Sequence, residues 1–385
     1  MTGWGRYWLA RPLHPVAWWI WALGVAVAAS RTTNPVVLAT IVAVVSWVVV
    51  ARRADAPWAR AYRFYLIGGA VIVVLRIVFR VLFGGGGGGF VLVPLPSVPL
   101  PSWVAGVRLL GDVTAAQVLG GLYDGLRLAT MLVCLGAANA LANPRRLLRS
   151  LPPALSEVST AVVVALSVFP QLAESVLRVR RARRLRARPP ARRLASLRSV
   201  VVPVLEDALD RSMLLAASMD ARGHGRRSGR SHRRIVVNGV AMVAGLAGVC
   251  VGVYGTLDTT TPRYLGLPTL GLGVAVGIAG IAMSGRTVVR SAYQPDSWRL
   301  AECLTIASGV GAGVVGWLAA TLDPALVAPS IEPLGWPQPS TVAMAGVLLA
   351  LLPAFATPLP EEPTRPVPEP EAPTPIGRAP AGVAT

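Results

Sequence analysis

The amino-acid sequence predicts an all-α polytopic membrane protein with about eight transmembrane helices and a cytoplasmic platform of further helices. Hydrophobic residues make up 54% of the 385 residues and charged residues only 14%, whereas a soluble domain carries roughly 25% charge. Apolar stretches recur along the chain at lengths that approach the ~20 residues of a membrane-spanning helix. The basic residues, all of them arginines, are concentrated between these stretches.

Eight apolar stretches are the expected crossings. They are residues 13–29, 35–50, 64–83, 113–141, 235–255, 264–284, 300–320 and 340–356. Several are short and need flanking residues to complete a crossing. The first stretch ends in small residues, as a signal peptide does, but a second apolar stretch follows almost at once. We therefore expect a retained first helix.

The positions of the arginines predict the orientation of the chain. With a cytoplasmic N-terminus, eight crossings place almost every arginine cluster on the cytoplasmic side, including the whole of 142–234. Only three arginines then fall in outer loops, and these are Arg31, Arg108 and Arg263. This asymmetry is the one that membrane insertion follows. We expect a multi-pass protein of the inner or plasma membrane with both termini in the cytoplasm.

A ninth apolar stretch, 154–177, is not expected to cross the membrane. It is interrupted by Pro170, Gln171 and Glu174, and arginine clusters flank it on both sides. If it crossed, one of these clusters would lie outside and every later loop would be inverted, against the positive-inside rule. We expect it to lie at the cytoplasmic face.

These assignments divide the chain into four parts. Residues 1–141 form an N-terminal membrane domain of four helices, and 142–234 form the cytoplasmic helices. Residues 235–356 form the C-terminal membrane helices. The segment 357–385 is rich in proline and glutamate, cannot bury a core and is expected to be disordered.

The sequence disfavours several classes of chemistry. The three cysteines lie far apart in apolar stretches and the three histidines lack ligand spacing, so we expect no metal site, no disulfide and no cofactor. Without lysine the chain has no Walker motif and does not hydrolyse ATP itself. A membrane phosphotransferase would need further aspartates around its single Asp-Ala-Arg-Gly. We therefore expect a protein without enzymatic activity.

The cytoplasmic segment contains ten arginines between Arg178 and Arg198. No acidic residue lies between Glu174 and Glu206. Such a run can anchor the chain on anionic lipid headgroups, at about 1 kcal/mol per basic residue. Nucleic-acid binding is disfavoured, because no aromatic residues are interleaved with the arginines.

Two helices of this segment each end in an arginine. Along the second helix, one predicted apolar stripe consists of Val201, Leu205, Ala208, Ser212, Leu215 and Met219, and acidic residues with Arg211 are placed on the other side. Pro203 suits a first turn and Gly223 the position after the helix end. Arg222 then projects from the terminus, either to complement the helix dipole or to insert into a partner. The first helix, 165–187, ends at Leu185-Arg186-Ala187.

Within the membrane, the fourth expected crossing carries Asp124 and Arg127, three residues apart, which is the spacing of a local ion pair. The third carries Arg76 and Arg80. Intramembrane charge is costly and is often functional. Local pairing and snorkelling explain these residues as well, and that interpretation is preferred.

The chain resembles the transmembrane T component of energy-coupling factor (ECF) transporters, the CbiQ/EcfT family. Four stretches carry the resemblance, over roughly 1–285. They are "LHPVAWWIWALGVAVAASRTTNPVVL", "ANPRRLLRSLPP", "ALSVFPQLAESVLRVRRARRLRA" and "VVPVLEDALDRSMLLAASMDARGHG". The last matches the second coupling helix of the family and its Ala-Arg-Gly, here Ala221, Arg222 and Gly223. In the first coupling helix, Leu185-Arg186-Ala187 replaces Ala-Arg-Gly.

The resemblance implies a non-catalytic scaffold and energy-coupling subunit of an ABC importer for a vitamin, metal or other micronutrient. Two cytoplasmic ABC ATPases would receive Arg222 and Arg186, and a membrane substrate-binding S component would select the solute. The 300–356 helices would be an addition to the family pattern. The alternative from the residues alone is a polybasic membrane scaffold without a transport role.

The orientation can be tested by cysteine labelling in intact cells. The charge distribution requires both flanks of 151–177 to be cytoplasmic. Single cysteines introduced near 147 and 190 should therefore both resist an impermeant reagent applied from outside. Labelling of either one would contradict the predicted topology.

Overall fold

The computed structural model describes residues 10–54, 59–83, 90–94, 96, 98–99, 108–109, 111–150, 156–185, 193–222, 232–258, 262–285, 298–331 and 335–359. The chain divides into two compact units. The first comprises 1–144 together with 296–385, and the second comprises 145–295. Each unit is described by itself below.

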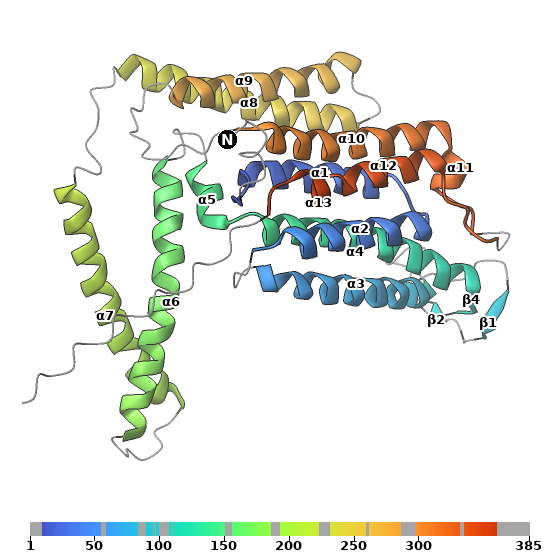
Figure 1. Ribbon diagram of the computed structural model, residues 1–385. Helices are drawn as coiled ribbons and strands as arrows, with labels where there is room; N and C mark the ends of the chain where they lie inside the picture. The colour runs from blue at the N-terminus through green and yellow to red at the C-terminus, as the bar shows by residue number, and fades with distance from the viewer. Residues whose placement is uncertain are drawn as a thin grey trace, which may run out of the picture. The chain divides into compact units, whose positions relative to one another are not determined.

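The first unit is a bundle of apolar helices (Figure 1). Its elements are α1 (Pro15–Ser30), α2 (Pro35–Arg52), η1 (Ala59–Ala61), α3 (Tyr62–Phe83), α4 (Ala115–Leu141), α10 (Leu300–Leu322), α11 (Pro324–Val327), α12 (Thr341–Leu351) and α13 (Pro353–Ala356). Between α3 and α4 lie two antiparallel strand pairs, β1 (Val91–Val93) with β4 (Val113–Thr114) and β2 (Val98–Pro99) with β3 (Arg108–Leu109). The short helix α5 (Pro144–Arg149) spans the boundary between the units.

The second unit contains two helix pairs. One is formed by α6 (Ser156–Leu185) and α7 (Arg193–Ala221). The other is formed by α8 (His232–Leu257) and α9 (Leu267–Gly285), which the short η3 (Arg263–Leu265) precedes. In the α8–α9 hairpin glycines face each other, and a Cβ added at Gly245 would come within 2.6 Å of the Gly277 amide nitrogen. Small residues allow membrane helices to approach this closely.

The all-α membrane fold is confirmed, and each of the eight expected crossings coincides with a helix. Within the described residues, six helices are long and apolar enough to span a membrane, and three shorter apolar helices accompany them. One of the six is the 159–183 part of α6, the stretch that was expected to remain at the surface. The helix continues through Pro170, because a single proline removes one hydrogen bond and bends a helix without always ending it. That α6 does not cross remains a prediction.

Local capping explains where the first helices begin. His14 and Asn34 each precede a proline at the first helical position, where the missing amide hydrogen costs nothing. The His14 Nδ1 accepts from the Val16 amide, and the Asn34 Oδ1 accepts from the Val36 amide. Thr114 and Gln117 cap each other's backbone amides at the start of α4.

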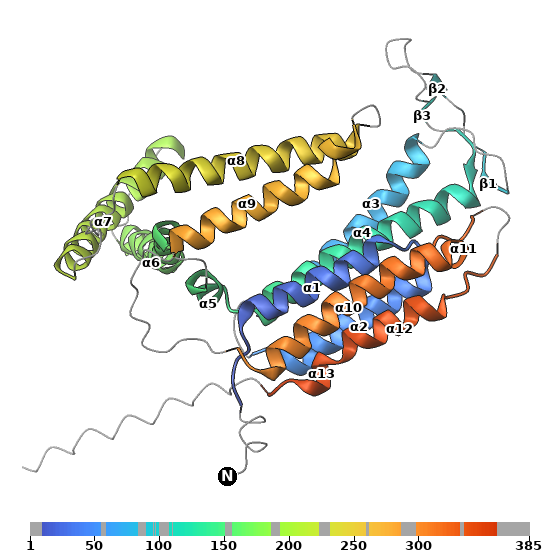
Figure 2. The same cartoon turned by 90° about the horizontal axis from the view of Figure 1, so that it is seen from above.

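The C-terminal helices complete the core of the first unit. Figure 2 shows α10 beside α1, and α12 contacts both α10 and α2. The Trp21 indole donates to the Ala350 carbonyl, and the Asn34 amide donates to the carbonyls of Leu326 and Gln338. The contacts thus group 300–356 with α1–α4 and α8–α9 with α6–α7, a different division from the expected single group 235–356.

A buried ion pair ties the N-terminal segment to α10. The Arg11 guanidinium contacts Glu302 through two hydrogen bonds, from Nη1 to Oε1 at 2.6 Å and from Nη2 to Oε2 at 3.0 Å. Glu302 is fully buried and also accepts from the Arg299 amide. Beside it the His14 and Trp298 rings stack with centroids 4.6 Å apart. Two-point contact is the strongest geometry for an arginine and a carboxylate.

The packed part of the chain extends slightly into the segment that was expected to be a disordered tail. The Thr357 side chain is buried and its hydroxyl donates to the Pro353 carbonyl. The Arg11 amide donates to the Leu359 carbonyl. The rest of the expected tail, from 360, lies outside the described residues.

The Arg11–Glu302 pair predicts a stability effect. Glu302→Ala would leave the Arg11 charge without its partner, and breaking a buried pair costs about 3–5 kcal/mol. We expect a clearly lower midpoint of thermal unfolding for the purified protein in detergent. Arg53→Ala, which removes an exposed arginine just after α2, is the control. An unfolding midpoint for Glu302→Ala equal to that of the control would show that the pair does not stabilise the bundle.

Candidate functional site

The α6–α7 pair is the part of the described chain in which apolar, basic and acidic residues are combined in long exposed helices. The two helices run antiparallel, because Ser175 of α6 bonds to Asp207 of α7, whereas Val164, earlier in α6, and Leu215, later in α7, line the same cavity. Large apolar side chains such as Phe169 on α6 and Met213 on α7 are exposed. The pair therefore has little apolar core of its own.

A polar contact joins the two helices where they cross. The Ser175 side chain on α6 is only 2% exposed, and its hydroxyl donates to Asp207 Oδ2 on α7 at 2.7 Å. Arg211 Nε, one turn further along α7, donates to the other carboxylate oxygen at 3.0 Å. Arg178 of α6 lies 3.9 Å from Oδ2. The Ser175 hydrogen bond, followed by the contacts of Arg211 and Arg178, lowers the pKa of Asp207, so the carboxylate remains charged at neutral pH.

The predicted stripe on α7 is partly wrong. Ala208, Ser212 and Leu215 do face α6, but Asp207 and Arg211, which were placed on the other side, face it as well. The stripe residues Val201 and Leu205 are about half exposed. The reason is physical: the carboxylate is satisfied by a serine on the neighbouring helix, so it need not face solvent.

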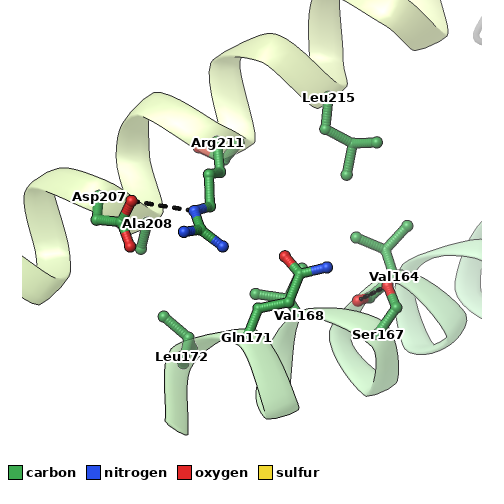
Figure 3. Close-up of a pocket in the computed structure, with 10 residues that line it drawn as sticks. Val164, Ser167, Val168, Gln171, Leu172, Asp207, Ala208, Arg211 and Leu215 are labelled. Carbon is green, nitrogen blue, oxygen red and sulfur yellow. Dashed lines mark hydrogen bonds and ion pairs between the residues drawn. The ribbon is translucent and has the colours of Figure 1, made fainter. Parts of the chain in front are cut away.

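A cavity of about 210 Å³ lies beside this crossing (Figure 3). Its wall from α6 contains Val164, Ser167, Val168, Gln171 and Leu172, and its wall from α7 contains Asp207, Ala208, Arg211, Ser212 and Leu215. In the close-up the Arg211 guanidinium points from α7 toward Gln171 on α6. The helices are thus incompletely packed next to their polar contact.

Arg222, which the sequence predicts to project from a helix terminus, lies at the end of α7. Ala221 is the last residue of that helix, and the exposed Arg222 follows it in a turn whose amide donates to the Met219 carbonyl. Leu185, which is 87% exposed, is the last residue of α6. Arg186, Ala187 and Gly223 lie outside the described residues. Because α6 and α7 are antiparallel, Leu185 and Arg222 belong to opposite ends of the pair.

Both helices contain an interior proline. Pro203 was expected in a first turn of α7, but the helix begins ten residues earlier, at Arg193. Pro170 lies inside α6. Each proline lacks the amide that would donate to the preceding turn, so each helix is easier to bend there. The sequence predicts too late a start for α7, because proline is common in the first turn of a helix and Pro203 is here an interior residue.

One intramembrane charge pair forms between two helices and not within one. Asp124 on α4 accepts from Arg80 on α3 at 2.9 Å, so the expected Asp124–Arg127 pair is wrong. Gly120 lies beside the pair, and a Cβ there would meet the Arg80 guanidinium at 2.9 Å, so a larger residue would shift that flexible side chain. The Arg80–Asp124 pair still joins two opposite charges inside an apolar layer, so a structural explanation holds for these two residues, with a partner on another helix.

The described residues contain no group of three or more His, Cys, Asp or Glu side chains that could hold a metal ion. Cys134 is buried in the first bundle, and all three cysteines are free thiols. The features of the described α6–α7 pair that could bind a partner are its exposed arginine and apolar faces, and a polar contact joins the two helices.

The comparisons with known proteins concern the same region. Residues 8–232, more than half of the chain, match the family model CbiQ, described as a cobalt transport protein. The match covers α1 to α7 and includes Arg222. The helices from α8 onward lie beyond it. No curated protein matches the chain.

Proposed function

The chain belongs to the CbiQ family of cobalt transport proteins, and from this premise we propose that it is the transmembrane scaffold and energy-coupling subunit of an ECF-type ABC importer. Membership of a transport family, together with several apolar helices, makes it a multi-pass membrane transport component. In the proposal, this subunit transmits motion from ATPases to a membrane-embedded substrate-binding subunit.

The observation that supports this role most directly is the position of Arg222. It is exposed at the end of a 29-residue helix, so a long helix holds a planar guanidinium with five donors away from the rest of the pair. Arg186 is proposed to act in the same way just beyond Leu185. In the antiparallel pair the two arginines would reach two separate partners, as two ATPase subunits require.

The proposed partners follow from the same residues. Two cytoplasmic ABC ATPases would bind Arg222 with its neighbours Ala221 and Gly223, and Arg186 with Leu185 and Ala187. A membrane S component would select the solute, a vitamin, a metal ion or another micronutrient, and the arginine-rich 178–198 stretch would rest on anionic lipids. ATP hydrolysis would occur in the partner subunits, and both termini of this chain would be cytoplasmic.

A polybasic scaffold without transport is the alternative. It would explain the ten arginines of 178–198 as bulk charge, and it would treat all of them as equivalent. The two proposals therefore differ in whether one arginine at a helix end matters more than others of equal charge.

Arg222→Ala should release the ATPases. A guanidinium docked in a groove makes charge-assisted hydrogen bonds of about 1.5–3 kcal/mol each, so losing even one should weaken binding about tenfold or more. Arg222→Lys keeps the charge but not the planar fork and should be impaired less. Arg186→Ala should weaken the second contact, and the double variant should abolish ATPase co-purification and substrate uptake.

The matched control is Arg192→Ala with Arg193→Ala, which removes two arginines from the same basic stretch. At equal protein levels this pair should leave co-purification and uptake near those of the unmodified chain. If the control pair loses as much as the Arg186 and Arg222 pair, the arginines act as bulk charge and the coupling proposal is wrong.

A further inference from the structure

We propose that Ser175 and Asp207 form a clasp that sets the crossing point of α6 and α7, and through it the spacing of the two arginine-bearing helix ends. They are positioning residues: neither touches a partner, but both determine where Arg186 and Arg222 are presented. The inference rests on the proposed coupling function, which gives that spacing its purpose.

The direction of the Ser175 hydrogen bond distinguishes this serine from its neighbours. A serine in a helix commonly donates to a carbonyl of its own preceding turn. Ser167 on α6 and Ser212 on α7, which both line the cavity, do so through the carbonyls of Val164 and Leu209. Ser175 instead donates across to a carboxylate oxygen of Asp207 at 2.7 Å, and a hydrogen bond to a charged acceptor is stronger than one to a backbone carbonyl.

The Asp207 carboxylate is held from both sides, so its position is defined. Oδ2 receives the Ser175 hydroxyl and lies near Arg178, both from α6. Oδ1 receives Arg211 Nε from its own helix, as the dashed line in Figure 3 shows. A carboxylate satisfied at both oxygens has few alternative rotamers, and the link that it forms resists sliding of one helix along the other.

Two features beside the clasp make the crossing geometry easy to change. The cavity of about 210 Å³ removes packing on one side of the contact. Pro170 and Pro203 each lie about one turn before the clasp residue of their own helix, where the missing amide hydrogen bond makes bending easier. Two helices that are easily bent beside their crossing need a specific bond at the crossing to hold one geometry.

The length of the helices amplifies any change at the clasp. From Ser175 to Leu185 the helix extends about 15 Å, and from Asp207 to Ala221 about 21 Å, at 1.5 Å per residue. A change of about 10° in the crossing angle would therefore move the end of α7 by about 4 Å. That displacement exceeds the tolerance of a hydrogen-bonded contact. Loss of the clasp would thus misplace the arginines without removing them.

The test measures this spacing directly in the full-length purified chain. Spin labels are attached at cysteines introduced for the exposed Leu185 and Ala221, with Cys134, Cys250 and Cys303 replaced by serine. Ser175→Ala and Asp207→Ala should broaden the label-to-label distance distribution or shift it by up to about 3 Å, the limit that the 15 Å arm of α6 sets for a 10° change. Asp207→Asn, which keeps an acceptor oxygen for Ser175, should be closer to the parent.

Ser212→Ala is the matched control, because it removes a cavity-lining hydroxyl that bonds only within α7 in the described contacts. Its distance distribution should equal that of the parent. Helical circular dichroism checks that each variant is folded, and if Asp207→Ala is not, Ser175→Ala, which removes a single hydroxyl from a helix, decides. Distributions for folded Ser175→Ala and Asp207→Ala that match the control would overturn the proposal.

A second readout separates this inference from the proposed function. In cells that also produce the ATPases, Ser175→Ala should weaken co-purification less than Arg222→Ala does, since each intact arginine can still dock by itself, but substrate uptake should fall severalfold because the spacing of the two is altered. If Arg222→Ala leaves ATPase binding unchanged, the proposed docking fails while the distance measurement still decides the clasp. If Ser175→Ala retains full uptake with altered spacing, the clasp has no role in coupling.

Discussion

The hydrogen bond from Ser175 to Asp207 is the contact on which the α6–α7 pair depends. Both helices expose large apolar side chains, and the cavity beside their crossing leaves part of that contact unfilled. In most helix pairs interdigitated apolar ridges fix the angle. Here a buried hydroxyl and a doubly held carboxylate fix it instead. A polar link of this kind specifies one register and leaves the outer faces available for partners, which suits a helix pair that must bind other subunits.

The first unit is held together by different means. Its helices approach closely at small residues, as where Gly24 of α1 meets Gly309 of α10, and a buried two-point ion pair joins Arg11 to Glu302. Close backbone contact and satisfied polar groups are the forces available when lipid removes the hydrophobic drive between helices. The C-terminal segment beyond the family match is part of this core, because Ala350 of α12 accepts from Trp21, and Leu326 of α11 and Gln338 accept from Asn34. The 300–356 helices, which lie beyond the family match, are thus an integral part of the bundle.

Much of the fold could be predicted from the sequence, because apolar length and arginine placement act on each segment separately. The eight stretches from 13–29 to 340–356 all coincide with helices, and Arg222 lies at a helix end as expected. Contacts between segments could not be predicted. The sequence placed Asp124 with Arg127 and put Asp207 on an outer face, because spacing reports neighbours along one helix and not across two. The start of α7 was misplaced because proline occurs both in first turns and at interior bends.

The central claim is that Arg222 docks on a cytoplasmic ATPase, and site-specific photocrosslinking tests it most directly. A photoreactive amino acid at Ala221, beside an unaltered Arg222, reports what lies against the end of α7 in intact cells. The account predicts a crosslinked product with an ATPase subunit, and a much weaker product from the same probe at Leu209, in the middle of the exposed face of α7. A complex that contains the ATPases but gives crosslinks from Ala221 only to lipid, or to the ATPase equally from both positions, would contradict it.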